Sequence, residues 1–487
     1  MTIRSTVLPV VVWHILSAVV GSGTFTTEAQ DAVSGTVHDS QTEKVVEAWQ
    51  GELQIAGQKL KLQLRLVNTN GKTLAMFDSI SQGVMGLAAT MVPHDSELRF
   101  EVPRVMGRFE GKLDPARKVA TGTWTQAGQG MPLVLSKTDE VIHELPKSQR
   151  PQTPQPPFAY QSEDVKFENS AAGIQLAGTL VIPAGDGPFP AVVLVSGSGP
   201  QDRDEEIFQH RPFLVIADYL ARHGIASLRY DDRGTHKSTG DFAAATTADF
   251  ASDTRAALAY LRDRQGVDRK RLGIVGHSEG GMIAAMLAAT ESDLSHVVLL
   301  AGPGVPGDEI LVSQTEALVK VSGLEGDALN AQVSGIRDIT KKIKEGAPRE
   351  EVDELIQELV SAQLPEDESQ EARKQTRSVL TSQLKQFATP WFEYFIRYDP
   401  RDDLRRARCP VLAMIGELDL QVLSSLNLPE IETALQAAGV DHRCEKLPRL
   451  NHLFQTAETG SIDEYFQIEE TISPEALAMI EEWVRAH

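Results

Sequence analysis

The sequence predicts an α/β protein in which a mostly parallel sheet, with helices on both faces, follows a small all-β domain. Three observations support this prediction. Short β-like runs fill residues 33–140, strands alternate with helices from residue 161, and a helix-rich stretch at 305–395 interrupts the alternation. We therefore expect two folded domains, with a helical cap inserted into the second.

The composition is that of an ordinary soluble globular protein. The 487 residues exceed the size of one ordinary core, so two or three domains are expected. Hydrophobic residues make up 41% of the chain and charged residues 24%, as in typical globular proteins. The net charge of −21 disfavours nucleic acids and anionic membranes as partners, because both are polyanions.

Residues 1–29 have the layout of a secretory signal peptide. Arg4 precedes an apolar run from Val7 to Val20, and small and polar residues then lead to a cleavage site after Ala29. The alternatives are a membrane anchor and a buried helix, but a run of about 14 residues is short for a bilayer span. We expect a secreted or periplasmic protein with no membrane span after signal cleavage.

Residues 33–140 carry the signals of an all-β sandwich or barrel. Apolar and polar residues alternate strictly in KLKLQLRL, and turn signals such as NTNGK, LDPARK and AGQG separate the runs. Residues 141–160 follow as a linker, in which PKSQRPQTPQPPFAY contains five prolines and no periodic apolar pattern.

The second domain is predicted at residues 161–304 and 396–487. Continuous apolar strands such as PAVVLV, LGIVG and VVLLAG alternate with amphipathic helices, which is typical of a sheet buried on both faces. The stretch 305–395, rich in Glu, Lys, Gln, Leu and Ala, is interpreted as a cap over the carboxyl edge of that sheet. The alternative for this stretch is a pair of solvated surface helices.

Ser278 lies in GHSEG, between an apolar strand and an alanine-rich helix. This strand–turn–helix context is the one a nucleophile elbow requires, and the flanking Gly276 and Gly280 allow strand and helix to pack closely. A serine hydroxyl needs an oriented base to remove its proton. In proteins with such an elbow, the acid and the histidine come after the serine in the sequence, and each lies just beyond the end of a strand.

Asp419 and His452 occupy those positions, in VLAMIGELDLQV and KLPRLNHLFQ. The predicted catalytic set is therefore Ser278, Asp419 and His452, with Glu417 and Asp399 as competing acids that fit the strand end less well.

The oxyanion of the tetrahedral intermediate requires two hydrogen-bond donors. One is expected to be the backbone N–H of Glu279, the residue after the nucleophile. The other is assigned to Ser198 in VLVSGSGPQD, with Gly199 as second choice. For a glycine-rich loop taken alone, the simpler interpretation is a tight turn.

Several motifs together resemble the α/β-hydrolase superfamily: VSGSGPQDRD, RYDDRGTHKSTGDF, GHSEGG, GELD and LNHLFQ. The sequence is most similar to bacterial secreted esterases of the dienelactone-hydrolase-like branch that carry an N-terminal β domain. The resemblance covers residues 160–487 well and the β domain more loosely. It implies an α/β-hydrolase fold, hydrolysis of carboxylic esters and the triad named above. One departure is His236, where relatives usually have glycine.

For the remaining candidate residues, a purely structural role is an alternative to a functional one. Trp391 and Phe395, in TPWFEYFIRYDP, could bind the acyl group of the substrate or belong to the core. Asp202, Arg203 and Asp204 lie beside the loop of the expected oxyanion donor and could touch the substrate, but are interpreted as a salt-bridged turn. Cys409 and Cys444 could form one disulfide or remain buried thiols.

No metal-ligand constellation, phosphate loop or dinucleotide fingerprint occurs, so no metal or cofactor is expected. The predicted function is a secreted serine carboxylesterase that hydrolyses small-molecule esters with short to medium acyl groups through an acyl-enzyme. The alternatives are a serine peptidase or amidase on the same core, and a non-enzymatic binding protein on a hydrolase scaffold.

Overall fold

A computed structural model describes residues 44–55, 58–69, 72–102, 105, 107–126, 129–143, 150–362, 377, 387 and 389–487. The expected signal peptide, residues 1–29, lies outside this range. Within the described residues, no helix has both the length and the apolar character needed to cross a bilayer.

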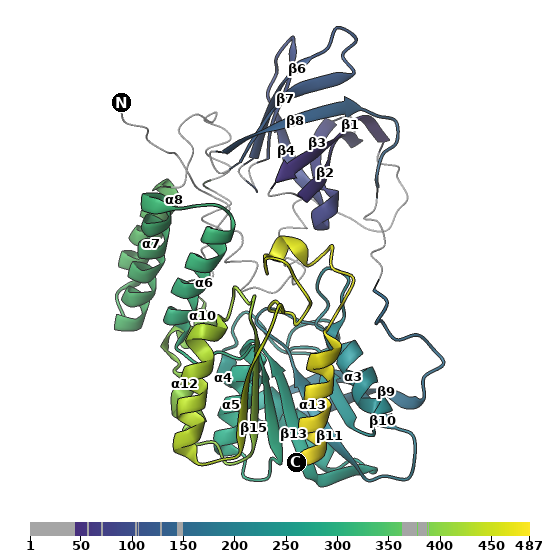
Figure 1. The fold of residues 1–487 in the computed structure, drawn as a ribbon, viewed down its shortest axis with the longest axis vertical. Coiled ribbons are helices and arrows are strands. Elements are labelled where there is room, and N and C mark those ends of the chain that lie inside the picture. Colours follow the sequence, from purple (N-terminus) through teal and green to yellow (C-terminus); the bar gives the residue numbers. More distant parts are fainter. Residues whose placement is uncertain are drawn as a thin grey trace.

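The N-terminal domain is a closed barrel of eight antiparallel strands (Figure 1). Of the two architectures that the strand pattern allowed, the chain adopts the barrel, because β1 pairs with both β2 and β8. Alternate side chains fill its interior, where the rings of Phe77 and Trp124 stack with centroids 5.0 Å apart. The strands are β1 (Lys44–Ile55), β2 (Gln58–Thr69), β3 (Lys72–Ser79), β4 (Val84–Met91), β5 (Glu97–Val102), β6 (Gly107–Leu113), β7 (Val119–Gln126) and β8 (Gln129–Lys137).

The second domain is built on an eight-stranded mixed sheet with the order β16-β15-β14-β13-β11-β12-β10-β9. The six strands from β11 to β16 are parallel, while β10 runs antiparallel to both of its neighbours. The strands are β9 (Tyr160–Asn169), β10 (Ile174–Pro183), β11 (Phe189–Val195), β12 (Ala226–Tyr230), β13 (Val267–His277), β14 (His296–Leu300), β15 (Val411–Gly416) and β16 (His442–Leu447).

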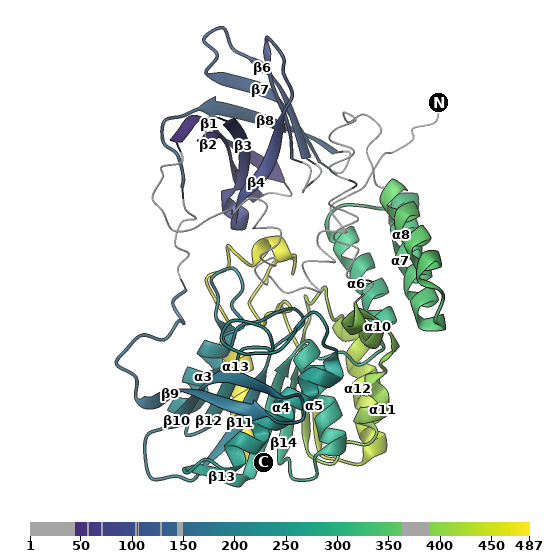
Figure 2. The same ribbon diagram turned by 180° about the vertical axis from the view of Figure 1, so that it is seen from behind.

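Helices cover both faces of this sheet, as the continuous apolar strands predicted (Figures 1 and 2). Helices α3 (Pro212–Arg222) and α13 (Pro474–Ala486) pack on one face, against side chains such as Val192. Helices α4 (Thr247–Arg262), α5 (Glu279–Thr290) and α12 (Ser424–Ala438) pack on the other, where Val193 points. The fold is that of the α/β-hydrolases, as the sequence predicted.

In the part of the insertion that the structure describes, four helices lie between β14 and the short helix α11 (Pro400–Leu404). They are α6 (Gly307–Val321), α7 (Gly326–Glu345), α8 (Arg349–Ala362) and α10 (Pro390–Arg397). Their apolar sides, including Ile336 and Phe392, join the core that covers the sheet. The inserted helices are therefore packed onto the second domain (Figure 1).

The barrel contacts the loop that follows β16. In the turn η1 (Ile80–Gln82), the amide of Gln82 donates to Asp463 over 3.0 Å, and Asp463 lies in the turn η4 (Ile462–Glu464). Arg150, after the barrel, donates to the carbonyl oxygens of Phe466 and Ile468. Figures 1 and 2 show η4 between the barrel and the sheet.

Both cysteines are free thiols, so the disulfide alternative is wrong. Cys409 is buried just before β15 and Cys444 lies half-buried in β16. Burial raises the pKa of each thiol to about 12. The two side chains therefore behave as small apolar groups.

Candidate active site

Ser278 occupies a sharp turn between β13 and α5, with φ 53° and ψ −114°. A positive φ is strained for a residue with a side chain, and such strain is concentrated at functional sites. A Cβ on Gly276 would lie 2.0 Å from the carbonyl oxygen of Gly280, and one on Gly280 would lie 2.1 Å from that of Val195. Both glycines of the motif are therefore required by main-chain packing.

Asp419 and His452 meet through a buried hydrogen bond. His452 Nδ1 lies 2.8 Å from Asp419 Oδ2, and the side chains of the histidine and the aspartate are 5% and 0% exposed, respectively. The other carboxylate oxygen, Oδ1, accepts the backbone N–H groups of Gln421 and Val422, each over 2.8 Å. The carboxylate is thus fixed at both oxygens and holds the proton of the imidazole on Nδ1, which leaves Nε2 with its lone pair.

The competing acids have other partners. Glu417 lies 3.6 Å from Lys446 Nζ and accepts the backbone N–H of Arg449. Asp399 caps α11 and accepts from the Arg401 guanidinium over 2.7 Å, which lowers the pKa of a carboxyl that burial alone would raise. Asp419 is the acid that the structure brings to His452.

The loops that carry the serine and the histidine are in direct contact. His277, next to Ser278, has its Nε2 3.0 Å from the carbonyl oxygen of His452. The rings of His277 and His452 have centroids 4.8 Å apart. The three predicted catalytic residues, far apart in the sequence, thus come from neighbouring loops at the carboxyl edge of the sheet.

The expected oxyanion donors lie beside the serine. A Cβ on Gly197 would lie 3.2 Å from Ser278 Cβ, which brings the loop after β11 against the elbow. The next residue, Ser198, donates its hydroxyl to the Glu279 carboxylate. Glu279 is the first residue of α5, so its backbone N–H lies outside the intrahelical hydrogen bonds. The role of both residues as oxyanion donors stays a prediction.

The Glu279 side chain, for which the sequence indicated no role, joins three segments. Its carboxylate accepts from Thr247 Oγ1 over 2.6 Å and from the Trp391 indole N–H over 2.7 Å, besides the Ser198 hydroxyl. Burial raises the pKa of this carboxyl, and the hydrogen bonds oppose that rise. The acid next to the nucleophile thus ties α4, the inserted helix α10 and the oxyanion loop together.

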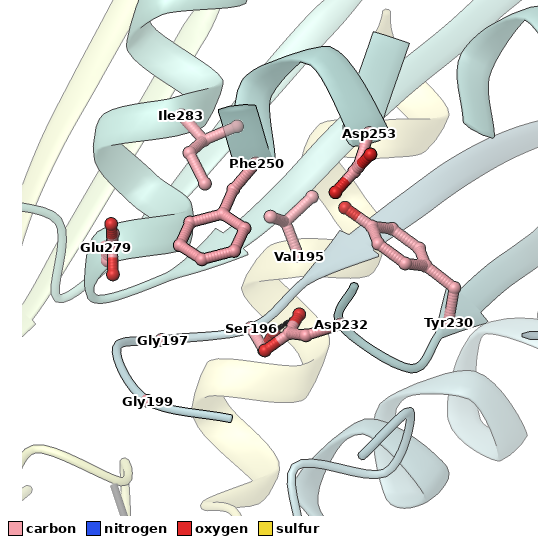
Figure 3. A pocket seen from close by; sticks show the side chains of 10 residues that line it. All are labelled: Val195, Ser196, Gly197, Gly199, Tyr230, Asp232, Phe250, Asp253, Glu279 and Ile283. Atoms are coloured by element: carbon pink, nitrogen blue, oxygen red, sulfur yellow. Dashed lines mark hydrogen bonds between the residues drawn. The ribbon is translucent and has the colours of Figure 1, made fainter. Parts of the chain in front are cut away.

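A small pocket lies behind the oxyanion loop (Figure 3). Asp232 accepts there from Ser196 Oγ and from the Gln201 backbone N–H, each over 2.9 Å, and burial raises its pKa. The lining residues are Val195, Ser196, Gly197, Gly199, Tyr230, Asp232, Phe250, Asp253, Glu279 and Ile283. Asp232 thus fixes the loop after β11 through Ser196 and Gln201.

The two aromatic candidates differ in position. The Trp391 ring stacks on Phe395, with centroids 5.3 Å apart, and its N–H reaches Glu279. Phe395 is buried in the main core and packs against Gly307. The structure therefore brings Trp391 to the residue beside the nucleophile and places Phe395 behind it.

Asp202, Arg203 and Asp204 are tied into the loop as a salt-bridged turn. Arg203 lies 2.7 Å from Asp231, and Asp204 lies 2.7 Å from Arg229. Asp202 accepts the backbone N–H groups of the residues two and four positions later.

His236 is exposed with φ 47°, in the left-handed region that favours glycine. Glycine, the residue expected at this position from the family resemblance, would adopt this backbone conformation without strain. Among the residues that the structure describes, no group of three or more His, Cys, Asp or Glu side chains is arranged to hold a metal ion.

The mixed sheet, its elbow serine and the buried acid–histidine pair define a hydrolase of the α/β-hydrolase superfamily. The chain belongs to the X-Pro dipeptidyl-peptidase (S15) family, whose model matches residues 172–431.

Among curated proteins, esterase EstD of Thermotoga maritima is 28% identical over 315 residues, and the match spans 64% of each chain. Among solved structures, the α/β hydrolase GrgF from Penicillium is 16% identical with a TM-score of 0.42, covering 67% of this chain and 99% of its own. Dienelactone hydrolase from Anabaena variabilis is 16% identical with a TM-score of 0.36, covering 68% and 99%.

Proposed function

We propose that the protein is a secreted serine carboxylesterase that cleaves short to medium acyl esters through an acyl-enzyme. The observation that carries the proposal is the buried hydrogen bond between Asp419 and His452, beside a serine held on a strained turn. An imidazole oriented in this way is the base that a serine nucleophile requires.

In the acylation step, Ser278 Oγ attacks the ester carbonyl carbon and its proton passes to His452 Nε2. The Asp419 carboxylate stabilises the imidazolium that forms. The backbone N–H groups of Ser198 and Glu279 donate to the carbonyl oxygen as it becomes negative. The carbon–oxygen bond to the alcohol then breaks, and His452 returns the proton to the leaving alkoxide.

In the deacylation step, water attacks the acyl carbon and gives its proton to His452. The tetrahedral intermediate uses the same two donors. Its collapse breaks the bond to Ser278 Oγ, which takes the proton back from His452. The products are the carboxylic acid and the free enzyme.

The preference for short to medium acyl groups rests on the inserted helices. Trp391 on α10 contacts the residue next to the nucleophile, so an acyl group bound above Ser278 would meet an aromatic side chain of the cap. Each buried methylene adds about 0.8 kcal/mol of binding only until the enclosed space is full. Secretion rests on the layout of residues 1–29.

The second candidate is a serine peptidase, which the family description favours. A dipeptidyl-peptidase has to hold a charged amino terminus, for which a carboxylate beside the nucleophile would serve. The two acids that contact the elbow and its neighbouring loop, Glu205 and Glu279, already accept hydrogen bonds from protein donors. This arrangement, together with the resemblance to EstD, supports ester hydrolysis over peptide hydrolysis.

Purified protein should be assayed with p-nitrophenyl esters from acetyl to palmitoyl and with X-Pro p-nitroanilides, with Ser278→Ala as the control. The proposal predicts turnover of the shorter esters, weak cleavage of the anilides and loss of both in the variant. If the anilides are cleaved faster than every ester, the protein is a peptidase and the esterase proposal is wrong. Equal ester turnover in Ser278→Ala would exclude the serine mechanism.

A further inference from the structure

A second buried acid–histidine pair lies beside the predicted triad. His277, the last residue of β13, has its Nδ1 2.9 Å from Oε1 of Glu205. Glu205 lies in the loop between β11 and α3, with a backbone φ of 52°. His277 and Glu205 are 7% and 4% exposed, respectively. The proton transfers described above use neither side chain.

The pair contacts all three parts of the catalytic machinery. The same carboxylate oxygen of Glu205 accepts the backbone N–H of Gly197 over 2.7 Å, immediately before the expected oxyanion donor. His277 is bonded covalently to Ser278, and its Nε2 reaches the main-chain carbonyl oxygen of His452 over 3.0 Å. The pair therefore links the oxyanion loop, the nucleophile and the base through one set of hydrogen bonds.

The partners of His277 define its charge. A carboxylate faces one ring nitrogen and a carbonyl oxygen faces the other, and only the doubly protonated imidazolium donates from both. Burial alone would lower the pKa of His277, but Glu205, the His452 carbonyl and the charge of Asp419 together raise it. The titratable groups that face His277 are Glu205, Asp419 and His452, each from a different loop.

We propose that Glu205 and His277 are positioning residues that act as a charged pair. The pair holds Gly197 and the backbone of His452 at fixed positions relative to Ser278. This inference rests on the proposed function, because it concerns the geometry of that reaction. A displacement of about 1 Å in a catalytic group can cost about 100-fold in rate. Loss of the pair should therefore lower kcat more than it changes KM.

Two substitutions at Glu205 separate its charge from its shape. In Glu205→Gln the amide oxygen can still accept from Gly197 and His277, but the negative charge is lost. His277 then deprotonates at a lower pH, and a neutral ring loses one of its two donated hydrogen bonds. In Glu205→Ala neither partner retains its acceptor.

The matched control is Asp78→Asn in the barrel. Asp78 is a fully buried acid that pairs with Arg65 over 2.7 Å, on the other domain. Its substitution removes a buried charge of the same kind without touching the loops around Ser278. A general loss of stability should therefore appear in the control as well.

The experiment measures kcat and KM for a short acyl ester from about pH 6 to about pH 9. For Glu205→Gln, we expect the ratio of wild-type to variant kcat to grow about tenfold or more across this range. For Glu205→Ala, we expect a fall of about 100-fold in kcat at every pH. A Glu205→Gln ratio that stays constant with pH, as in Asp78→Asn, would overturn the proposal.

Thermal unfolding tests the pair without any substrate. Because the pKa of His277 is raised on folding, its pairing stabilises the protein fully below the ordinary histidine value of about 6.5. This contribution is lost as the pH rises through the raised pKa. The Tm difference between wild type and Glu205→Gln should therefore shrink with rising pH, and a constant difference would refute the charged pair.

The two tests also separate this inference from the proposed function. If the wild type hydrolyses no ester, the proposed function fails, while the Tm comparison still decides the pair. If the wild type is an esterase and Glu205→Gln matches it at every pH, only the pair is refuted.

Discussion

Replacing Asp419 with Asn changes one proton position while leaving the shape of the site intact. Asp419 Oδ1 accepts two backbone N–H groups, from Gln421 and Val422, each over 2.8 Å. In the variant, the amide oxygen has to take this place because only it can accept. The NH₂ group then faces His452 Nδ1, where the wild-type carboxylate accepts over 2.8 Å.

This geometry sets the size of the effect. A donor facing Nδ1 forces the ring proton onto Nε2, so His452 can no longer accept the proton of Ser278. The wrong tautomer is expected to lower kcat by about 10⁴-fold, which corresponds to about 5.4 kcal/mol of transition-state stabilisation. The two backbone hydrogen bonds survive, so the Tm should change little.

The assay is the turnover of a short acyl ester by wild type, Asp419→Asn and the matched control Glu417→Gln. Glu417 lies two positions away and has Lys446 as its partner, so its variant should keep nearly full activity. If Asp419→Asn retains more than about a tenth of the wild-type kcat, the tautomer argument is refuted. A large loss in Glu417→Gln instead would identify the wrong acid.

Two further outcomes are expected. In Gly280→Ala the new Cβ would lie 2.1 Å from the carbonyl oxygen of Val195, so melting curves should show a loss of at least about 1–3 kcal/mol of stability, together with reduced turnover. Trp391→Ala should shift the acyl-length profile towards longer chains; an unchanged profile with a lower Tm would place the ring in the core with Phe395.

The features that local sequence could predict are those set by periodicity and by strand ends. Alternation in KLKLQLRL indicated the β domain, and continuous apolar strands indicated a sheet buried on both faces. The carboxyl ends of parallel strands meet at one edge, so the positions of Ser278, Asp419 and His452 just beyond strand ends were enough to predict that they lie together.

The features that local sequence could not predict depend on pairings between residues that are far apart in the chain. Whether the β domain closes depends on the pairing of β1 with β8, such as Trp49 with Lys137, and strand patterns alone do not show it. Glu205 follows four polar or charged residues in an irregular loop, and no local pattern distinguishes it from Glu206. Its contact with His277, 72 positions away, arises from the conformation of that loop.

Covalent labelling tests the central claim most directly. The enzyme should be treated with a fluorophosphonate, which reacts with activated serine nucleophiles, and the adduct located by peptide mass spectrometry. We predict one adduct per chain, on Ser278, formed in step with the loss of ester turnover, and neither labelling nor turnover in Ser278→Ala. Ester turnover that persists in the fully labelled enzyme or in Ser278→Ala, or an inactivating adduct on another residue, would contradict the account.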